Sequence, residues 1–386
     1  MKSHFLLDPN ITYLNFGSFG ACPKPIFEDY QKWQLELEKE PVQFVAFKST
    51  GYLKAARQAL ANYIHCHEDD VVYTPNPSYA INIITKSLKL NPGDEILSTN
   101  LEYGAMDKTW SHYSTQTNAK YVRQPITLPL TSKAQFLTEF WKGLTPRTKV
   151  IFIGQITSAT ALILPVKEIC DRAKELGLLT IVDGAHVPGH ISLNLRELNA
   201  DIYTGACHKW MMTPKGCSFL YVSKDQQQWV DPLVVNWGYE SVAPSHSQFQ
   251  DYHELQGTRD ISAFLTVPKA IEFMKENQWE QKAAECRTLL KKNINRFCTL
   301  LHSKPLCPVT DEFLGQIVSI PLRTKEPEVL QRLLFTDYNI EVPVMKHGMQ
   351  TFIRYSIQAF NTQHDLDTLF TALENILKNT SLIELD

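Results

Sequence analysis

The sequence predicts an α/β protein with a mostly parallel central sheet between two layers of helices, followed by a smaller α+β domain. Between about residues 50 and 225, short apolar runs alternate with longer amphipathic runs of helical period. Strands separated by helices of this length indicate βαβ units and hence parallel neighbours. After about residue 262 the alternation stops, and long amphipathic runs with two isolated apolar runs replace it.

The helices and strands of the larger domain are recognised by the spacing of their apolar residues and by the turn residues between them. Apolar residues every three or four positions indicate helices, and short unbroken apolar runs indicate buried strands. Turn residues separate them: Asn91-Pro92-Gly93-Asp94 precedes one strand, and Gly177 ends one helix. The predicted elements are helix 51–65, strand 70–74, helix 78–90, strand 95–99, strand 149–154, helix 165–177, and strands 178–183, 201–206 and 217–222.

The smaller domain is predicted to combine amphipathic helices with two strands. Its elements are one or two helices over 267–301, strand 316–322, helix 326–340, strand 351–358 and helix 364–379. We therefore expect a large domain over 16–262 and a small domain over 263–386 that also takes residues 1–15. The run 225–256 has no clear period, and a loop of that length in a compact domain is usually functional or covers a site.

Composition excludes several classes of protein. The 386 residues are 44% hydrophobic and 20% charged, which is ordinary for a globular enzyme. A formal net charge of -3 gives no electrostatic case for nucleic acid or an anionic membrane as partner. No apolar run has transmembrane length, and the N-terminus lacks the apolar core of a signal peptide. We expect a cytoplasmic protein.

The cysteines predict neither disulfides nor a metal centre. Eight are scattered along the chain without a C-x-x-C pair, so free thiols are expected in a cytoplasmic protein. The only cluster that suggests a metal site is His65-Cys66-His67 with Asp69 and Asp70. Adjacent residues point apart, and no second ligand pair follows at zinc spacing. We therefore predict no metal.

Two predicted strands end in polar residues of complementary chemistry. The run LLTIVD ends at Asp183, and DIYTGA is followed by Cys207, His208 and Lys209. The carboxyl edge of a parallel sheet is where α/β proteins bind ligands. A lysine can form a Schiff base with an aldehyde, and a carboxylate can keep a pyridine nitrogen protonated, so the pair predicts pyridoxal 5'-phosphate (PLP). The alternative is ordinary: aspartates often end strands, and a lysine after a strand is usually a solvated loop residue.

Three further segments could complete such a site. Ser78 and Tyr79 begin a predicted helix, where backbone N–H groups bind phosphate, although an ordinary helix cap is the simpler interpretation. Tyr103 follows strand 95–99 and could lie flat on a cofactor ring, or could be a surface tyrosine. Gln155 follows strand 149–154 and offers neutral hydrogen bonds to a cofactor or substrate, or only to its own loop.

Two residues of the C-terminal third belong to the same group of candidates. Arg354 lies in an apolar strand, where an unpaired charge is costly, and its fork of donors suits the carboxylate of a substrate. An internal salt bridge explains Arg354 equally well. Thr258 begins a helical run, where a threonine is usually only a cap.

Together these segments resemble the class V aminotransferases, a family of fold-type I PLP enzymes, over almost the whole chain. The similarity is strongest to the isopenicillin N epimerase-like branch, which also includes C–S lyases. The segments that carry it are YLNFGSFGACP, NPSYAIN, NLEYGAMD, QITSATALILPV, IVDGAHVPG, YTGACHKWMMTPKGCSFLYV, QGTRD and IRYSIQAFNT. They are specific for the family and much less specific for one reaction.

The resemblance implies a role for each candidate toward the cofactor. Lys209 forms the Schiff base, Asp183 pairs with the pyridine nitrogen, and Ala185 packs under the ring. Tyr103 stacks on the ring, and Gln155 and His186 approach its hydroxyl group. The remaining implied contacts, all to phosphate, are Ser78, the backbone at Tyr79, and His208.

The resemblance also implies a substrate site and an assembly. Arg354 binds the carboxylate of a small amino-acid substrate, and Asn15 to Ser18 line the entrance. Thr258 reaches the phosphate held by a partner subunit, which implies a homodimer with shared active sites.

Two departures from the family pattern bear on function. Many relatives have a serine where this chain has Ala206, so different phosphate contacts are expected here. Cysteine desulfurases carry a nucleophilic cysteine before the carboxylate-binding arginine, but DYNIEVPVMKHGMQTFIR contains none. A persulfide-forming desulfurase is therefore not expected, and Cys207 is assigned a structural role.

The expected activity is a reaction at Cα or Cβ of an amino acid. Epimerisation ranks first, C–S lyase chemistry close behind it and transamination third. All three begin with removal of the same proton, so the sequence separates these reactions poorly. Epimerisation needs a second acid, for which Tyr103, His186 or the 225–256 run are candidates. A non-catalytic relative is disfavoured because Lys209 and Asp183 are both present. A nicotinamide oxidoreductase is disfavoured because neither GSFG nor GAHVPG fits the G-x-G-x-x-G spacing.

Overall fold

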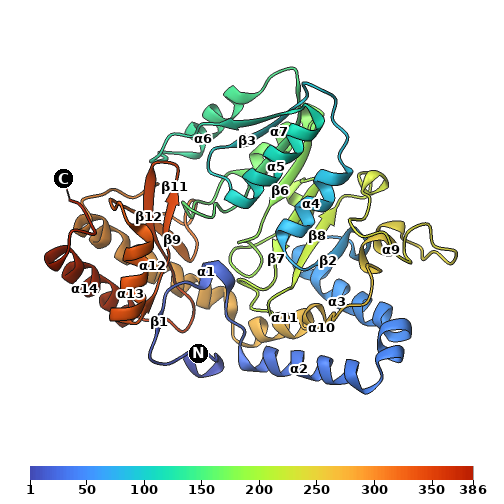
Figure 1. The fold of residues 1–386 in the computed structure, drawn as a ribbon, viewed down its shortest axis with the longest axis horizontal. Helices are drawn as coiled ribbons and strands as arrows, with labels where there is room; N and C mark the ends of the chain where they lie inside the picture. The colour runs from blue at the N-terminus through green and yellow to red at the C-terminus, as the bar shows by residue number, and fades with distance from the viewer. Residues whose placement is uncertain (386) are drawn as a thin grey trace.

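A seven-stranded sheet forms the centre of the computed structural model, which describes residues 1–385 (Figure 1). The strand order is β2-β8-β7-β6-β5-β3-β4, and β8 runs antiparallel to both of its neighbours while the other pairs are parallel. The α/β class and the mostly parallel sheet are thus confirmed. The strands are β2 (Val71–Thr74), β3 (Glu95–Thr99), β4 (Lys120–Gln124), β5 (Thr148–Gly154), β6 (Leu179–Asp183), β7 (Ile202–Ala206) and β8 (Ser218–Val222).

Both faces of this sheet are buried, which is why its inner strands are continuous apolar runs. Successive residues of β5 illustrate this, because Val150 and Phe152 join one apolar cluster whereas Ile151 and Ile153 join another. Helices α4 (Pro77–Ser87) and α5 (Gly104–Thr117) cover the first face. The helices that contribute to the opposite cluster include α2 (Lys24–Lys39), α3 (Ser49–Ile64), α6 (Lys133–Phe140), α7 (Val166–Glu175), α8 (Leu195–Leu198), α10 (Ser262–Leu265) and α11 (Val267–Glu276).

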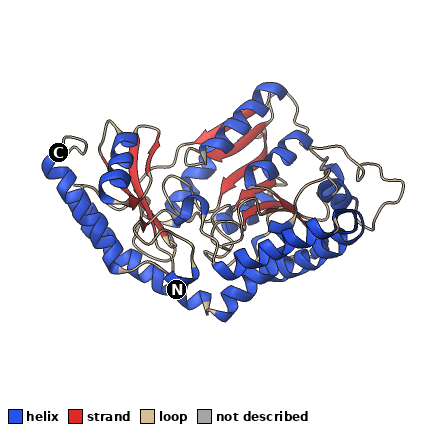
Figure 2. Cartoon of the chain, turned by 60° about the horizontal axis from the view of Figure 1, so that its bottom comes forward, coloured by secondary structure: helices blue, strands red, loops and turns tan. Residues whose placement is uncertain are grey.

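A second, three-stranded antiparallel sheet lies apart from the first (Figure 2). Its order is β11-β12-β9, with β9 (Ile317–Leu322), β11 (Val344–His347) and β12 (Gln350–Ser356). Near the N-terminus, β1 (Thr12–Tyr13) pairs in parallel with β10 (Ile340–Glu341). The helices of this part are α12 (Trp279–Leu300), α13 (Pro327–Tyr338) and α14 (Gln363–Asn379). The division at residues 262 and 263 stays a prediction.

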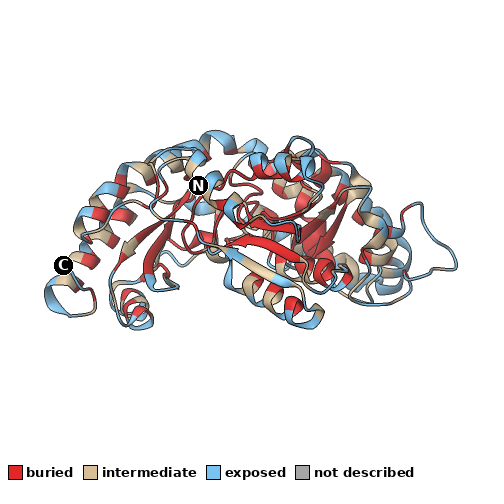
Figure 3. Ribbon diagram, turned by 90° about the horizontal axis from the view of Figure 1, so that it is seen from above, coloured by how far each residue is buried: buried red, intermediate tan, exposed pale blue. Residues whose placement is uncertain are grey.

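Several elements are short or lie on the surface. Helix α1 (Phe16–Phe19) follows β1, and α9 (Gln248–Glu254) follows an exposed loop that projects from the large domain in Figure 3. The remaining turns of helix are η1 (Lys2–His4), η2 (Gln43–Lys48), η3 (Glu68–Asp70), η4 (Trp141–Gly143) and η5 (Gln227–Trp229). Within residues 1–385, no helix is both long and apolar enough to cross a membrane.

The region between strands β3 and β5 was not predicted in detail, for a physical reason. Helix α5 is rich in Ser and Thr and buries only a narrow stripe that includes Met106, Trp110 and Tyr113. Strand β4 is an edge strand without a buried residue, so it has no apolar run by which it could be recognised.

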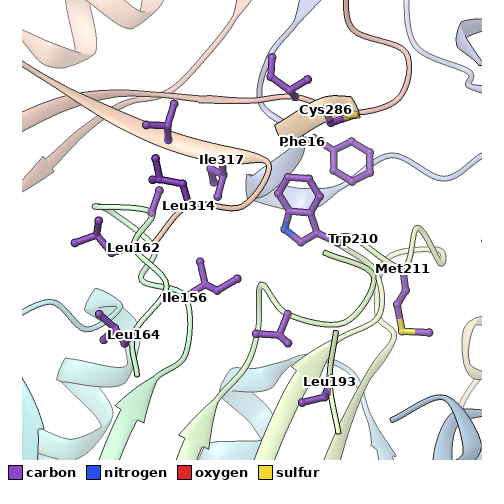
Figure 4. Close-up of a cluster of buried hydrophobic side chains, with 14 of the residues drawn as sticks. Phe16, Ile156, Leu162, Leu164, Leu193, Trp210, Met211, Cys286, Leu314 and Ile317 are labelled. Atoms are coloured by element: carbon purple, nitrogen blue, oxygen red, sulfur yellow. The ribbon is translucent and has the colours of Figure 1, made fainter. Parts of the chain in front are cut away.

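An apolar cluster joins the two sheets and includes side chains of the loops that follow the strands (Figure 4). Leu162 and Met211 come from loops of the large domain, while Leu314 and Ile317 belong to the approach to β9 and its first residue. Trp210, whose side chain is fully buried, contacts Phe16 of α1 with 5.2 Å between ring centroids. The relative position of the two sheets is therefore set by a packed core.

One buried ion pair attaches α9 to α3. The side chains of Arg57 and Glu254 are only 3% and 7% exposed, and Arg57 Nη1 donates to Glu254 Oε1. Burial raises the pKa of Glu254, and the Arg57 charge opposes that shift. Removing one partner leaves the other charged group buried without compensation.

We expect Arg57→Met to lower the free energy of unfolding by about 3–5 kcal/mol, as for other broken buried pairs. The matched control is Lys167→Met, which breaks the half-exposed pair with Asp171 and should change stability by less than about 1 kcal/mol. Urea denaturation of the three proteins measures both effects. Equal effects of the two substitutions would contradict the role given to the buried pair.

Candidate active site

A cavity of about 370 Å³ lies at the carboxyl ends of the parallel strands, where the two sheets approach each other. Segments that follow β2, β3, β5, β6 and β7 form most of its wall, and α1, β11 and β12 complete it. Its lining residues are Gly17, Ser18, Phe19, Asn76, Pro77, Ser78, Glu102, Tyr103, Met106, Gly154, Ile156, Thr157, Ser158, Asp183, Ala185, His186, His208, Lys209, Met345 and Arg354.

Asp183 and Lys209 both line this cavity, as the positions of their strands predict. Asp183 is the last residue of β6, and its Oδ1 accepts a hydrogen bond of 2.9 Å from the N–H of Ala185. Burial raises the pKa of Asp183, whereas the Ala185 N–H and the Lys209 charge favour its ionised form. Burial lowers the pKa of Lys209 to about 8, with Asp183 opposing and Arg354 assisting that shift. At pH 7 about a tenth of Lys209 is therefore a free amine, a far larger share than for a lysine in water.

The backbone supports Lys209 through a close approach of α1. Gly20 ends α1 with φ +65°, a conformation that side chains rarely adopt. A Cβ at this position would lie 2.6 Å from the carbonyl oxygen of Lys209. Gly20 of the GSFG segment thus packs against the backbone of Lys209, whereas a Cβ at Gly17 would meet Ile317 and Ser356 of the second sheet.

His186 lies beside the lysine. Its Nε2 is 3.3 Å from Lys209 Nζ, and its Nδ1 accepts a hydrogen bond of 3.4 Å from the indole N–H of Trp210. Burial lowers the pKa of His186 well below its ordinary value, and the neighbouring charges of Lys209 and Arg354 lower it further. The ring is therefore neutral.

The first turn of α4 forms the anion-binding side of the cavity. Asn76 caps this helix, because its Oδ1 accepts a hydrogen bond of 2.8 Å from the N–H of Tyr79. The half-buried Ser78 lies in the same turn and lines the cavity. Capping and anion binding are compatible here, since only one of the free N–H groups at the helix start is used by the cap.

Glu102 is a residue of the site to which we assigned no role from the sequence. Its carboxylate accepts hydrogen bonds from Thr99 Oγ1 at 2.7 Å and from the Gly154 N–H at 2.8 Å. Burial, assisted by the Asp183 charge, raises its pKa to about 8. Glu102 is therefore mostly protonated at neutral pH, so it adds little negative charge beside Asp183. Its position directly after β3, next to the exposed Tyr103, is the signal that could have identified it.

Arg354 comes from the second sheet and is only 2% exposed. Its Nη1 donates to the Ser158 carbonyl oxygen at 2.6 Å, and its Nη2 donates to Ser18 Oγ at 2.8 Å. Its Nε has no hydrogen-bond partner, and no carboxylate in residues 1–385 forms an ion pair with it. An internal salt bridge, the alternative interpretation, is therefore not observed in the described chain. A buried cation without an anionic partner is suited to an anionic ligand.

Four of the predicted site residues do not line the cavity. The backbone N–H of Tyr79, the group expected to bind phosphate, donates to Asn76, and its side chain contacts Gln256. The amide oxygen of Gln155 accepts a hydrogen bond from Tyr203. Asn15 lies behind Ser18 and accepts its hydroxyl hydrogen at 2.5 Å. Thr258 is exposed and outside the cavity of its own chain. No residue of the 225–256 run lines the cavity, so this run does not cover it within the chain.

The residues present fit PLP. The cavity combines a buried amine of lowered pKa, a buried acid, an aromatic side chain and the start of an eleven-residue helix. These are the groups needed for an aldehyde, a pyridine nitrogen, a planar ring and a phosphate, respectively. His208 also lines the cavity, and its Nδ1 lies 2.8 Å from the Cys217 carbonyl oxygen. Burial lowers the pKa of His208 to about 4, so it is a neutral ring.

Comparison with known proteins agrees with this geometry. The family model for aminotransferase class-V matches residues 25–369. Isopenicillin N epimerase from Streptomyces clavuligerus is 30% identical over 97% of this chain and 96% of its own length. The enzyme of the same name from Amycolatopsis lactamdurans is 29% identical over 96% of both chains. A probable L-cysteine desulfhydrase from Arabidopsis thaliana is 25% identical over 96% of this chain and 84% of its own.

Solved structures share the fold at lower sequence identity. The cysteine desulfurase CsdA from Escherichia coli has a TM-score of 0.78 and 21% identity, with 97% of both chains covered. A C-DES variant with glycine covalently linked to its PLP cofactor has a TM-score of 0.80 and 20% identity, with 95% of this chain and 96% of that chain covered. The fold is thus that of fold-type I PLP enzymes. With a family model that spans most of its length, the chain belongs to the class V aminotransferases, a family of PLP-dependent enzymes.

Proposed function

We propose that this protein removes the α-proton of a small amino acid and returns it to the opposite face, as an isopenicillin N epimerase-like isomerase. The observation that carries the proposal is the cavity itself, in which Lys209 and Asp183 lie with an arginine that lacks an anionic partner. The epimerases named above, similar over nearly the full length, support this choice of reaction.

The side chains of the cavity have complementary tasks. Arg354 binds the α-carboxylate of the substrate, and Ser18 holds the guanidinium in place through its hydrogen bond. Lys209, whose lowered pKa makes the free amine available, takes the proton from Cα. When bound, PLP supplies a ring that accepts the electrons left at Cα, and ionised Asp183 keeps the ring nitrogen protonated.

Return of the proton to the other face requires a second acid. Tyr103 and His186 both line the cavity, and Tyr103 is 48% exposed at its mouth. The neutral His186 is a weak acid for this purpose, so Tyr103 is the better candidate. The remaining proposed cofactor contacts follow the family pattern, and three of them line the cavity: Ser78, Ala185 and His208. Those of Tyr79 and Gln155 rest on the family pattern alone, because the Tyr79 N–H donates to Asn76 and the Gln155 amide oxygen accepts from Tyr203.

A C–S lyase is the second candidate. β-Elimination of a sulfur leaving group needs one base and no second acid, and Lys209 alone meets that requirement. The desulfhydrase from Arabidopsis thaliana supports this alternative. No cysteine of residues 1–385 lines the cavity, so sulfur would leave as sulfide or thiol and not as an enzyme persulfide. Transamination ranks third.

The assembly we propose is a cytoplasmic homodimer. Thr258 is exposed on the surface of its own subunit, as expected for a residue that completes the phosphate site of a partner. The neighbouring Gly257 has a φ of +98°, which gives this turn a backbone conformation suited to glycine.

The cofactor assignment predicts a yellow protein in which borohydride fixes PLP on Lys209. A peptide map of the reduced protein should place the modification on the peptide that contains Lys209, because this is the buried amine of the cavity. The control Lys215→Ala should keep the modification, and Lys209→Ala should lose it together with turnover. Modification of another lysine, or a colourless protein whose spectrum ignores added PLP, would contradict the assignment.

The reaction can be identified with amino acids and cysteine conjugates in deuterium oxide. An epimerase exchanges the α-hydrogen for deuterium and changes the configuration without other products, whereas β-elimination releases pyruvate. We expect exchange with inversion for at least one substrate. Pyruvate release with no inversion for any substrate would assign the protein to the lyase class. Transfer of the amino group to an added oxo acid would indicate an aminotransferase.

Arg354→Gln should raise KM for the amino acid about 10- to 150-fold, since a charge-assisted hydrogen-bonded pair contributes about 1.5–3 kcal/mol. The effect on kcat should be smaller, and PLP should remain bound. The surface variant Arg172→Gln, which alters a cation contacting Trp141, is the control and should leave KM unchanged. An unchanged KM for Arg354→Gln would exclude it as the carboxylate-binding residue.

A further inference from the structure

We propose that Trp210 and His190 are positioning residues that keep the single proton of His186 on Nε2, the ring nitrogen that lies next to Lys209. The proposal rests on the proposed role of Lys209 as the base. It concerns which nitrogen of His186 holds a proton, and this can be measured whether or not the protein turns over a substrate.

The indole of Trp210 selects one tautomer of His186. An indole N–H can only donate, so the nitrogen that it contacts must accept. Trp210 Nε1 lies 3.4 Å from His186 Nδ1. In a neutral imidazole the proton must then reside on the other nitrogen, Nε2, which is 3.3 Å from Lys209 Nζ.

A neutral ring follows from its surroundings. His186 is 4% exposed, and the charged or ionisable side chains that act on it are Lys209, Arg354, His190 and His208. All four lower the pKa of His186, so none stabilises an imidazolium. With the proton on Nε2, His186 donates to the lone pair of the Lys209 amine. That hydrogen bond favours the unprotonated lysine, the form a base requires.

His190 contacts both Trp210 and His186 and thereby fixes the position of one relative to the other. Its ring stacks on the Trp210 indole with centroids 4.0 Å apart and an angle of 19° between planes. Its Nδ1 lies 2.8 Å from the His186 carbonyl oxygen, and its Nε2 accepts the N–H of Gln316 at 2.5 Å. Since Nε2 accepts, Nδ1 carries the proton and donates to that carbonyl group.

The support for His190 comes from the second sheet. Gln316 immediately precedes β9, and a Cβ at Gly315 would lie 2.2 Å from His190 Nε2, so only glycine permits this approach. Phe16 of α1 also contacts the indole of Trp210, and Figure 4 shows the two rings side by side. The Trp210 indole thus contacts Phe16 and His190, and His190 is in turn held by the segment before β9.

The direct test is histidine NMR on the full-length holoenzyme with nitrogen-15-labelled histidine. Two-bond proton–nitrogen correlations distinguish the two tautomers, and a His186→Gln sample assigns the signals. We expect His186 as the Nε2–H tautomer in the wild-type protein. An Nδ1–H tautomer or an imidazolium at neutral pH would overturn the proposal without any variant of Trp210.

The variant Trp210→Phe keeps an aromatic ring for His190 and Phe16 but removes the N–H. We expect part of His186 to change to the Nδ1–H form. In the holoenzyme the Lys209 nitrogen is the Schiff-base nitrogen, whose lone pair accepts the same hydrogen bond. Its pKa, read from the pH dependence of the cofactor absorbance, should rise by up to about one unit because a donor to that lone pair is lost. Activity is not needed for either measurement.

The matched control is Trp110→Phe. Trp110 is also fully buried, but its indole N–H has no partner in the described chain, and it lies on the opposite face of the large sheet. It should lose comparable packing with no change in the tautomer or in the Lys209 pKa. If both variants change the His186 tautomer and the Lys209 pKa equally, or neither does, Trp210 acts only through packing and the proposal is overturned.

Discussion

The transfer of one lysine amine from water into a mostly apolar cavity is the constraint on which the rest of this structure depends. A desolvated ammonium is unfavourable, so Lys209 is driven toward the free amine, and Asp183 limits how far that shift goes. The same cavity holds a second acid, Glu102, whose raised pKa keeps it mostly neutral. Burial therefore limits how many side chains of the cavity carry a charge, because it disfavours both the ammonium of Lys209 and the carboxylate of Glu102.

This arrangement requires both sheets. The parallel strands supply the lysine, the aspartate and the start of α4, because their carboxyl ends meet at one edge. The antiparallel sheet supplies Arg354, which lies among neutral hydrogen-bond acceptors and not beside a carboxylate. The shared apolar core around Trp210 and Leu314 keeps these two contributions at a fixed separation. The geometry of the cavity therefore depends on the packing of the core between the two sheets.

Much of the large sheet could be predicted from sequence because both of its faces are buried. Strand 95–99 was predicted with the observed bounds, and strand 149–154 differs from β5 by one residue. Edge strand β4 and helix α5 could not be predicted in detail, since neither has a strong apolar pattern.

The sequence predicted that residues at or shortly after strand ends lie at one edge of the sheet, and Asp183 and Lys209 both line the cavity there. The direction of a side chain could not be predicted where a distant neighbour binds it. Gln155 follows β5 as predicted, but its amide oxygen accepts the hydroxyl hydrogen of Tyr203, a contact between residues 48 positions apart. The protonation of Glu102 likewise depends on burial by the whole fold, which no local pattern contains.

The hydrogen bond from Arg354 to Ser18 joins positions 336 residues apart. During synthesis, the lysine loop and the start of α4 leave the ribosome long before the arginine does. A nascent chain can therefore contain every strand of the large sheet while it still lacks the buried cation of the cavity. The cavity is completed only when almost all of the polypeptide has emerged.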